Sequence, residues 1–486
     1  MFGARIVSGD EFWISIAQSA RFVIRLGPVS VPLRAPMSLL DLPGPDGWPV
    51  LGNLPQLTPT RLHRQLDSWC AEYGPVYRLS MPGRRLVVVG DPEIGKEVLR
   101  QRPGTYRRQS SIESIMSEMG SNGLFSSEGE AWRRRRRLAM PAFNAAHLTR
   151  FHTTLEQITE RLRRRWLAAP PEDVRADLTR YTVDVTAKLT FDYDINTLEQ
   201  SGDVIQRHLE HVFPMINRRL NIPFPYWRYV KLPADHALDR ALDALRAEVN
   251  AVIARARTAA PEQPTNFIEA FLLASDGGES FTDDELFAEA LTILIAGQDT
   301  TSNAAAWLLY HLAAEPEAQE RIREEIARIP STLERQPYLE AVVAESMRLQ
   351  PTTPLLLMEA VHDTVLRDIA LPAGTWVLVD VRYPGLQEEN FADPQRFDPE
   401  RWLRGADGRA HRPDVSIPFG SGPRFCPGRG LAMLEVKSVA AMACRTFDFR
   451  IPEGVPPPDD RFHFAVIPVG LRLDLAPRPA DREFEG

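Results

Sequence analysis

Cysteine is scarce in this sequence: Cys70, Cys426 and Cys444 are the three thiols among 486 residues. A small, odd number of cysteines does not suit a disulfide framework. The sequence also lacks a CxxC pair or a His/Cys cluster with zinc-like spacing, which argues against a zinc site. Because free thiols fit a reducing compartment, we expect a cytoplasmic protein.

An apolar stretch long enough to cross a membrane is also lacking. The longest uncharged stretch near the N-terminus, residues 12–20, ends at Arg21, whereas a spanning helix needs about 20 apolar residues. A clean secretory cleavage pattern is absent too. We therefore expect no transmembrane anchor and assign residues 1–40 to an N-terminal extension. This extension is an amphipathic or partly ordered arm, with association at a membrane surface as the alternative.

Positive charge is in deficit overall, with 57 Lys and Arg against 65 Asp and Glu and a net charge of −8. This balance argues against general nucleic-acid binding. A run of five arginines, residues 133–137, is the local exception. A basic face can therefore exist on an acidic protein.

The sequence has ample apolar material, since 44% of its residues are hydrophobic, and no internal repeat or low-complexity linker divides it. Short strand-like runs occur at residues 76–79 and 85–89. A mainly helical pattern follows from about residue 90 to 350, and proline-punctuated strands and turns come after it. We expect a mainly α fold with a smaller β portion, an α+β arrangement.

One long helix is predicted clearly. Thr282 and Glu285 form a capping box, and the apolar pattern continues to Ala314, before Pro316. About 30 residues give a helix of roughly 45 Å, which is enough to cross the domain. Its nearly all-apolar middle, residues 291–297, is expected to be buried on all sides. A further helix is expected from near Gly428 to Thr446.

A Gly/Pro-rich loop at residues 419–428 holds one cysteine just before that second helix. A Cys426 thiolate is a strong ligand for iron and favours O–O cleavage, and backbone N–H groups of a tight loop can stabilise it. Gly420 and Gly422 permit positive-φ turns, and Gly428 permits close approach to a flat cofactor. Arg424 can neutralise a carboxylate of that cofactor, and Phe419 can shield the sulfur from water. The alternative is an inert buried thiol.

The loop resembles the haem-binding signature of the cytochrome P450 family, F-x-x-G-x-R-x-C-x-G. The fixed positions agree at Phe419, Gly422, Arg424, Cys426 and Gly428. The resemblance covers residues 42 to about 478. It implies haem b bound through Cys426, a single catalytic domain at residues 41–486, a long helix crossing over the haem, and a soluble, bacterial type of member.

The middle of the long helix carries Ala296-Gly297-Gln298-Asp299-Thr300-Thr301. A buried Asp is costly unless it is paired or hydrated. By the resemblance, Ala296 lies at the haem, Thr300 hydrogen-bonds the oxygen, and Asp299 relays protons. The alternative is that the Thr300 hydroxyl bonds to the preceding turn and bends the helix, which leaves Asp299 unexplained.

Two further patterns occur in the order that the family shows. Glu345 and Arg348 fit E-x-x-R, in which positions i and i+3 share a helix face. With Arg401 they are expected to form a buried structural cluster. Trp132 and Arg136 fit W-x-x-x-R, and by the resemblance both contact a haem propionate.

Arg133, Arg134 and Arg137 point elsewhere and form either a solvated basic face or a docking surface for an acidic electron-transfer partner.

The sequence departs from the family where many members have an arginine for the second propionate. Residues 356–360 contain no arginine, and residues 381–385 lack the His-Arg-Asp often seen there. Other groups must anchor that propionate, with Arg382 as one candidate, or the propionate is solvated.

The resemblance implies a monooxygenase that inserts one atom of O₂ into an apolar substrate by hydroxylation or epoxidation, as in secondary metabolism. Electrons are expected from a separate ferredoxin or flavodoxin with its reductase, and ultimately from NAD(P)H, and the enzyme is expected to be a monomer. The alternatives are a haem carrier or sensor, or a peroxide-using or isomerising relative. Candidate pocket segments are residues 110–125, 212–229, 287–300, 351–358 and 463–467. Within the second segment, an apolar lid and ordinary core packing are equally open for Phe213, Met215, Phe224, Tyr226 and Trp227.

Overall fold

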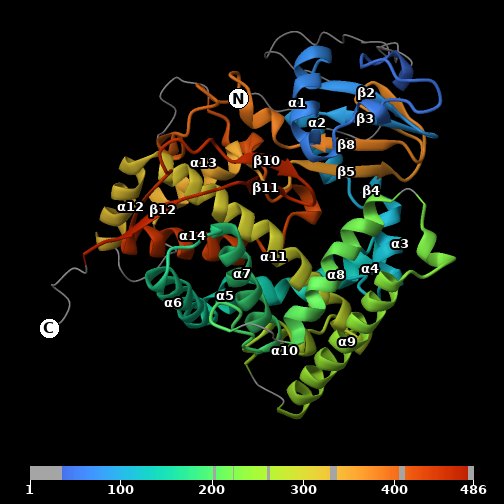
Figure 1. Cartoon of the computed structure of the whole chain (residues 1–486). Helices are drawn as coiled ribbons and strands as arrows, with labels where there is room; N and C mark the ends of the chain where they lie inside the picture. Colours follow the sequence, from blue (N-terminus) through green and yellow to red (C-terminus); the bar gives the residue numbers. More distant parts are fainter. Residues whose placement is uncertain are drawn as a thin grey trace, which may run out of the picture.

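The computed structural model describes residues 36–200, 204–222, 224–259, 263–328, 336–403 and 411–479. Most of these residues form helices, as the sequence predicts (Figure 1). The helices are α1 (Leu62–Tyr73), α2 (Pro92–Arg100), α3 (Ser110–Glu118), α4 (Gly129–Ala139), α5 (Ala145–Arg150), α6 (His152–Ala168), α7 (Val174–Phe191), α8 (Val204–Asn221), α9 (Pro233–Ala259), α10 (Phe267–Leu273), α11 (Asp283–Ala314), α12 (Pro316–Arg328), α13 (Pro337–Leu349) and α14 (Arg429–Thr446).

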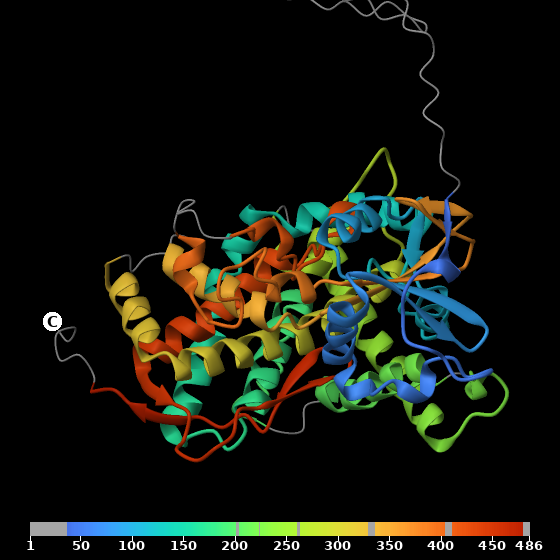
Figure 2. The ribbon, with the colours of Figure 1, turned by 90° about the horizontal axis from the view of Figure 1, so that it is seen from above.

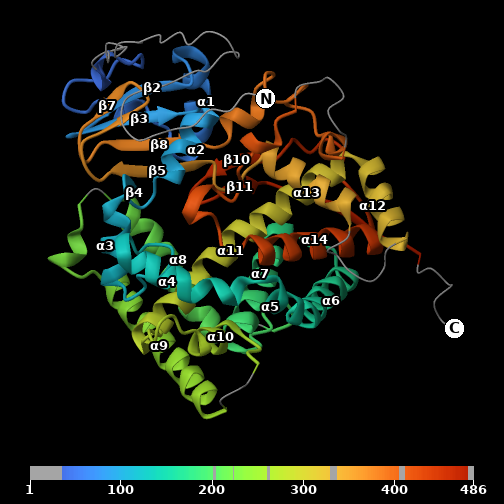
Figure 3. The ribbon, with the colours of Figure 1, turned by 180° about the vertical axis from the view of Figure 1, so that it is seen from behind.

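The long helix α11 runs through the middle of the helical part of the molecule, with α7 on one side and α13 and α14 on the other (Figures 1 and 3). Its N-terminus has the predicted capping box: the Thr282 side chain accepts from the Glu285 amide, and Glu285 accepts from the Thr282 amide. The helix ends at Ala314, as predicted. The predicted helix before Thr446 is α14.

The strands form small sheets, and the largest lies at one end of the molecule, opposite α12 (Figure 2). This five-stranded sheet has the order β2-β3-β8-β5-β4, and its β3–β8 pair is parallel while its other pairs are antiparallel. The smaller sheets are β1-β7-β6, β10-β11 and β12-β9. The bounds are β1 (Met37–Ser38), β2 (Val76–Met81), β3 (Arg84–Val89), β4 (Tyr106–Arg108), β5 (Leu355–Ala360), β6 (Thr364–Leu366), β7 (Ile369–Leu371), β8 (Trp376–Asp380), β9 (Phe447–Arg450), β10 (Asp459–Phe462), β11 (Val466–Val469) and β12 (Asp474–Pro477).

The packed fold begins earlier than the sequence predicts. Met37 and Ser38 pair in parallel with Ile369 and Ala370, and the side chain of Leu39 is buried. These residues were assigned to the extension because the proline-rich stretch from Leu42 onward is the first recognisable segment. Residues 1–35 of that extension lie outside the described residues.

The expectation that the middle of α11 is buried on all sides is wrong on one face. Leu291 and Leu294 are buried, but Ala296 is exposed and Gly297 is half-buried. An apolar sequence predicts burial but does not tell what covers each face. One face of the central helix therefore has no side chains packed over it at the position of Ala296.

Within the described residues, no helix combines the length and the apolar composition that crossing a membrane requires.

Candidate active site

The loop that holds Cys426 follows the short 3-10 turns after β8 and leads into α14, and it is closed by one backbone hydrogen bond. The Cys426 amide donates to the Phe419 carbonyl oxygen at 2.9 Å. Gly420 and Gly422 have φ of 73° and 72°, the left-handed conformation that glycine adopts readily. A Cβ on Gly422 would also lie 2.6 Å from the Leu99 carbonyl oxygen. The predicted need for glycine at these turns is confirmed, and Gly422 packs the loop against the end of α2.

The sulfur of Cys426 lies at the start of α14 among backbone amides. A Cβ on Gly428 would lie 3.8 Å from it. Burial raises the pKa of the Cys426 thiol, although the amides of Gly428 and Arg429 and the charge of Arg136 act in the opposite direction. A bound metal ion deprotonates such a thiol outright. The position therefore suits a metal-bound thiolate better than a free one.

Helix α4 brings Trp132 and Arg136 to this loop. Trp132 is buried, and the Arg424 guanidinium lies over its ring at 4.6 Å from the ring centroid. Arg136 donates to the Phe425 carbonyl oxygen at 3.1 Å and covers the Phe425 ring at 4.8 Å. The W-x-x-x-R pair and the Cys loop thus lie together although they are far apart in the sequence.

Three arginines gather around one carboxylate beside the loop. Arg424 forms an ion pair with Glu128 and donates to the Ser127 carbonyl oxygen at 2.5 Å. The Arg108 amide donates to Glu128 Oε1 at 2.9 Å, and Arg102 Nη2 lies 3.8 Å from the same oxygen. The side chains of Arg102 and Arg424 are almost completely buried. This arginine cluster (Arg102, Arg108, Arg424 and Glu128) therefore carries an excess of positive charge.

The arginine cluster also has buried polar atoms that form no hydrogen bond with the described residues. These are Nε and Nη2 of Arg102, Nε of Arg108 and Oε2 of Glu128. Burial lowers the pKa of Arg102 to about 9 and that of Arg108 well below its ordinary value. Buried charges and donors are costly unless they are paired. The cluster thus has the features of an anion site, and no motif in the sequence pointed to Arg102, Arg108 or Glu128.

On α11, the side chain of Thr300 is held by its own helix. Its hydroxyl donates to the Ala296 carbonyl oxygen at 2.8 Å, the back-bonding that the sequence left as an alternative. The Asp299 carbonyl oxygen accepts from Asn303 Nδ2 at 2.6 Å and from Ser302 Oγ at 3.3 Å. These bonds occupy backbone oxygens around the half-buried Asp299. Its carboxylate takes no part in them.

Burial raises the pKa of the Asp299 carboxyl, and the positive charge of Arg175 partly opposes that shift. Gly297 lets α7 approach closely, because a Cβ there would lie 2.9 Å from Thr186 Oγ1. The acid therefore lies where two helices pack tightly.

The structure brings together Glu345, Arg348 and Arg401 as a buried cluster. Arg348 donates to both carboxylate oxygens of Glu345, at 2.7 and 2.8 Å, and Arg401 Nε donates to it at 2.9 Å. Burial pushes the pKa of Glu345 upward, but Arg348 and Arg401 outweigh burial and leave it below the ordinary value. Arg348 also donates to the carbonyl oxygens of Gly385 and Pro394. The cluster joins α13 to the segments that precede the Cys loop.

Arg382, the candidate for the second propionate, is engaged elsewhere. It forms an ion pair with Asp67 of α1, and it feels the charges of Asp460 and Arg64. Its interactions within the described residues include none with the Cys loop. Arg102 and Arg108, rather than Arg382, lie beside Arg424 at Glu128.

The remaining arginines of the 133–137 run are paired with acids. Arg134 bonds to Glu285 and Arg135 to Glu289, which fastens α4 to the start of α11. Arg137 pairs with Asp276 at 2.6 Å. Arg133 pairs with Glu130 and is half-exposed. Arg133 and Arg137 thus face solvent more than Arg134, whose side chain is mostly covered.

The segment from the second half of α8 to Tyr229 contains both buried and exposed side chains. Met215 and Trp227 are buried, and Trp227 donates to Glu118 of α3 at 2.7 Å. Tyr226 is half-buried. Phe224 is exposed and stacks on Tyr229. Met215 and Trp227 therefore pack in the core, and the side chain of Phe213 lies outside the described residues.

Comparisons with known proteins agree with this geometry. The family model described as Cytochrome P450 matches residues 42–475. The chain is 30% identical to "Cytochrome P450 4F5" of Rattus norvegicus, over 77% of this chain and 76% of the relative. It is 28% identical to "Protein LUTEIN DEFICIENT 5, chloroplastic" of Arabidopsis thaliana, over 79% of this chain and 69% of the relative.

A third relative is much longer than this chain. The chain is 27% identical to the "Bifunctional cytochrome P450/NADPH--P450 reductase" of Gibberella moniliformis, over 91% of this chain but 41% of that protein. The family match spans nearly all of the described residues and includes the Cys loop and the α11 pattern. The chain therefore belongs to the cytochrome P450 family.

Proposed function

We propose that the chain is a haem-thiolate monooxygenase in which the Cys426 sulfur ligates the iron of haem b. Members of this family bind haem b and activate O₂. The observation that carries the assignment is the closed loop at Cys426, in which two positive-φ glycines and the Phe419 carbonyl place the sulfur at the start of α14. Phe419, Gly420 and Gly428 of this loop, and Ala296 of α11, would contact the bound haem.

The residues present fit haem b, because its two propionates match the arginine cluster. Arg102, Arg108 and Arg424 carry three positive charges against the single charge of Glu128. Two propionates would neutralise the excess and give the orphaned guanidinium donors acceptors. Arg424, Trp132 and Arg136 would then hold the cofactor from the loop and from α4. Arg108 and Arg102 replace the arginine that the sequence lacks after α13.

Bound haem supplies the redox chemistry, and the chain controls ligation, access and proton flow. In the proposed reaction, O₂, two electrons, two protons and a substrate C–H bond yield an alcohol and water. The Thr300 hydroxyl donates its hydrogen to the Ala296 carbonyl oxygen, so its own oxygen would accept a hydrogen bond from a protonated oxygen or a water molecule at the reaction site. Asp299, half-buried beside it, passes protons from water.

The electrons come from a separate donor in this proposal, a ferredoxin or flavodoxin with its reductase, and ultimately from NAD(P)H. The fused relative is named as a cytochrome P450 joined to an NADPH–P450 reductase, so in that protein the reductase is part of the same chain. Arg133 and Arg137 are the exposed cations on α4 that could meet an acidic donor. A single catalytic domain that includes strand β1, and so begins at Met37 rather than at residue 41, belongs to the same proposal, as do a monomeric state and a bacterial source.

A cytoplasmic location is also proposed, and the three cysteines support it. All three are free, and Cys70 and Cys444 are buried where no disulfide partner is near. Free thiols persist in reducing compartments.

The substrate is proposed to be apolar, such as a terpenoid, steroid, fatty acid or polyketide. Ala296 and neighbouring apolar residues of α11 give the helix a nonpolar face on the side where the haem would bind. Apolar pockets with a few polar groups bind such ligands.

Carbon monoxide binding and oxygen incorporation test this function. The reduced holoenzyme should give the thiolate type of carbon monoxide spectrum. With NADPH, surrogate ferredoxin and reductase, it should incorporate one ¹⁸O atom from ¹⁸O₂ into one of four probes: dodecanoic acid, styrene, limonene or progesterone. Probes are first ranked by their spin-state shift.

Two outcomes would contradict this function. A thiolate spectrum without probe-stimulated NADPH consumption would indicate a haem carrier or sensor. Turnover with hydrogen peroxide but none with NADPH, ferredoxin and reductase would indicate a peroxide-using relative. Thr300→Ala should divert consumed O₂ into hydrogen peroxide, and a Thr300→Ala variant with unchanged peroxide release would remove Thr300 from the mechanism.

A further inference from the structure

Residues 121–128 lead from α3 to α4, and their main chain packs directly on α11. Gly123 makes the closest approach. A Cβ there would overlap Thr292 Oγ1 and would lie 2.7 Å from the Ala288 carbonyl oxygen, nearer than real Cβ atoms come to such atoms. The absence of a side chain at this position therefore sets how near the segment lies to the helix.

Glu289 of α11 holds the same segment by hydrogen bonds. Its side chain is almost completely buried, and its Oε2 accepts from the Leu124 amide at 2.9 Å. Its Oε1 accepts from Arg135 Nη1 at 3.2 Å, and that nitrogen also donates to the Asn122 carbonyl oxygen at 2.6 Å. Glu289 and Arg135 thus bind an amide and a carbonyl two residues apart. Charge-assisted bonds of this kind are stronger than bonds between neutral groups.

The segment is also bonded to the arginine cluster. Arg424 donates to the Leu124 carbonyl oxygen at 3.3 Å and to the Ser127 carbonyl oxygen at 2.5 Å. The Leu124 amide is bonded to Glu289 and its carbonyl oxygen to Arg424, so one residue joins the buried acid on α11 to the cluster. Polar groups linked in this way inside a protein strengthen one another. A shift of Leu124 would therefore move the acceptors that orient the Arg424 guanidinium.

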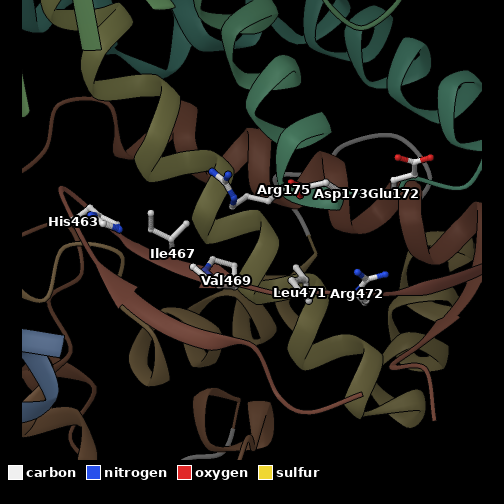
Figure 4. Close-up of a pocket in the computed structure, with 10 residues that line it drawn as sticks. Glu172, Asp173, Arg175, His463, Ile467, Val469, Leu471 and Arg472 are labelled. Atoms are coloured by element: carbon white, nitrogen blue, oxygen red, sulfur yellow. The ribbon is translucent and has the colours of Figure 1, made fainter. Parts of the chain in front are cut away.

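Phe125 provides a second link to the cluster. The Arg108 guanidinium lies over its ring at 3.9 Å from the centroid, a favourable cation–π contact. Phe464, in the turn between β10 and β11, contacts the same ring edge-on, with the centroids 6.3 Å apart. Beside this turn a cavity of about 510 Å³ lies between β11 and the start of α7, bordered by His463 and Ile467 (Figure 4). Because atoms that line a void lose packing contacts, the hairpin supports Phe125 less firmly than the main chain held on α11 does.

We propose that Glu289 is a positioning residue for haem binding, which acts through residues 121–128 on the arginine cluster. It keeps Leu124 and Phe125 where Arg424 and Arg108 can meet the propionates. The inference rests on the proposed function, in which the arginine cluster binds the propionates of haem b. Glu289 acts at a distance from the cofactor, because its two oxygens are engaged by the Leu124 amide and by Arg135.

The test is the rate at which the haem-loaded enzyme releases haem to apomyoglobin. It is measured at pH 8, where the Glu289 carboxyl is mostly ionised, since burial raises its pKa to about 7. Glu289→Ala should release haem roughly three- to tenfold faster than the wild type, a part of what one charge-assisted hydrogen bond contributes. Glu289→Gln keeps an oxygen that can accept from the Leu124 amide and should restore most of the slow release. The carbon monoxide spectrum should stay of the thiolate type in both variants.

A double variant tests whether Glu289 acts through the arginine cluster. In an Arg108→Met background, Glu289→Ala should accelerate release by less than half of the factor seen in the wild type, because residues of one network do not act additively. Equal factors in the two backgrounds would overturn the proposal. If Glu289→Ala does not fold, Arg135→Met tests the same link with the same expectations, since it removes the bond to the Asn122 carbonyl oxygen.

Asp184→Ala is the matched control. Asp184 is buried on α7 and accepts from the amides of Thr197 and Leu198 at 2.8 and 3.2 Å, so it too holds a backbone segment from a helix. Residues 197 and 198 take no part in the arginine cluster. Equal acceleration by Asp184→Ala and Glu289→Ala, or no acceleration by Glu289→Ala, would overturn the positioning role. A wild type that binds no haem would instead refute the proposed function, so the two failures are distinguishable.

Discussion

The Cys426 amide donates to the Phe419 carbonyl oxygen at 2.9 Å, which joins the two ends of the loop that bears the sulfur. This bond makes the sulfur project from a closed turn rather than from an extended segment. The loop is further held by Gly422 against the Leu99 carbonyl oxygen and by Arg424 against Glu128. The position of the Cys426 sulfur is therefore set by the contacts of the loop with the fold around it.

Glu345→Gln should lower the free energy of unfolding by about 3–5 kcal/mol, because removing one partner leaves buried charge unpaired. Arg348 and Arg401 both bond to this carboxylate in the interior. Denaturant unfolding followed by circular dichroism measures the change. Glu340→Gln, an exposed position on the same helix, should alter stability little. Equal effects of the two variants would show that the cluster does not stabilise the fold.

Arg108→Met should release haem to apomyoglobin roughly ten- to a hundredfold faster than the wild type, since one charge-assisted hydrogen bond contributes roughly 1.5–3 kcal/mol. Arg102→Met should act in the same direction. Arg107→Met is the control, because Arg107 pairs with Glu113 instead. If Arg382→Met accelerates haem release while Arg108→Met does not, the second propionate binds near Arg382 and the assignment is wrong.

Glu289 should make stability depend on pH. Burial raises its pKa from 4.5 to about 7, despite the Leu124 amide and Arg135. Because the folded state holds the proton more tightly, this contribution is complete below about pH 4.5 and is lost as pH rises through about 7. The Glu289→Gln variant has no titratable carboxyl at this position.

The stability of the wild type relative to Glu289→Gln should therefore fall between pH 5 and pH 8 by up to about 3 kcal/mol. Thermal unfolding across this range measures the difference, with the exposed Glu279→Gln as control. A difference that does not change with pH would show that Glu289 is ionised throughout.

Arg133→Glu should slow reduction by ferredoxin at low salt and flatten the dependence of that rate on ionic strength, since charges at a docking surface steer association. Arg134 is unsuitable for this test because it fastens α4 to Glu285. Arg328→Glu, an exposed position on α12 at the far end of the molecule (Figure 2), is the control. Stopped-flow reduction rates that do not differ between the two variants would exclude Arg133 from docking.

Local patterns predicted much of the fold and part of the candidate site. The capping box at Thr282 and the apolar period to Ala314 determine α11 through neighbouring residues alone. The Cys loop and E-x-x-R were also recognisable, because glycines and i,i+3 pairs leave a signature in consecutive positions. These features depend on short-range geometry, which a sequence contains directly.

The arginine cluster could not be predicted in this way. Arg102, Arg108 and Arg424 meet at Glu128 only after β4, α4 and the Cys loop have packed together. Arg175 is likewise brought near Asp299 by the packing of α7 on α11. Charges that pair across long sequence separations leave no periodic pattern. For the same reason the sequence did not predict that Arg134, a candidate for the docking surface, pairs with Glu285.

The carbon monoxide difference spectrum of the reduced enzyme tests the haem-thiolate assignment most directly. The wild type should show the thiolate type of spectrum, and Cys426→Ser should lose it while Cys444→Ser, a change at a buried thiol on α14, keeps it. Haem content measured on the same samples separates loss of the ligand from loss of the cofactor. A thiolate spectrum that persists in Cys426→Ser would contradict the assignment of Cys426 as the iron ligand.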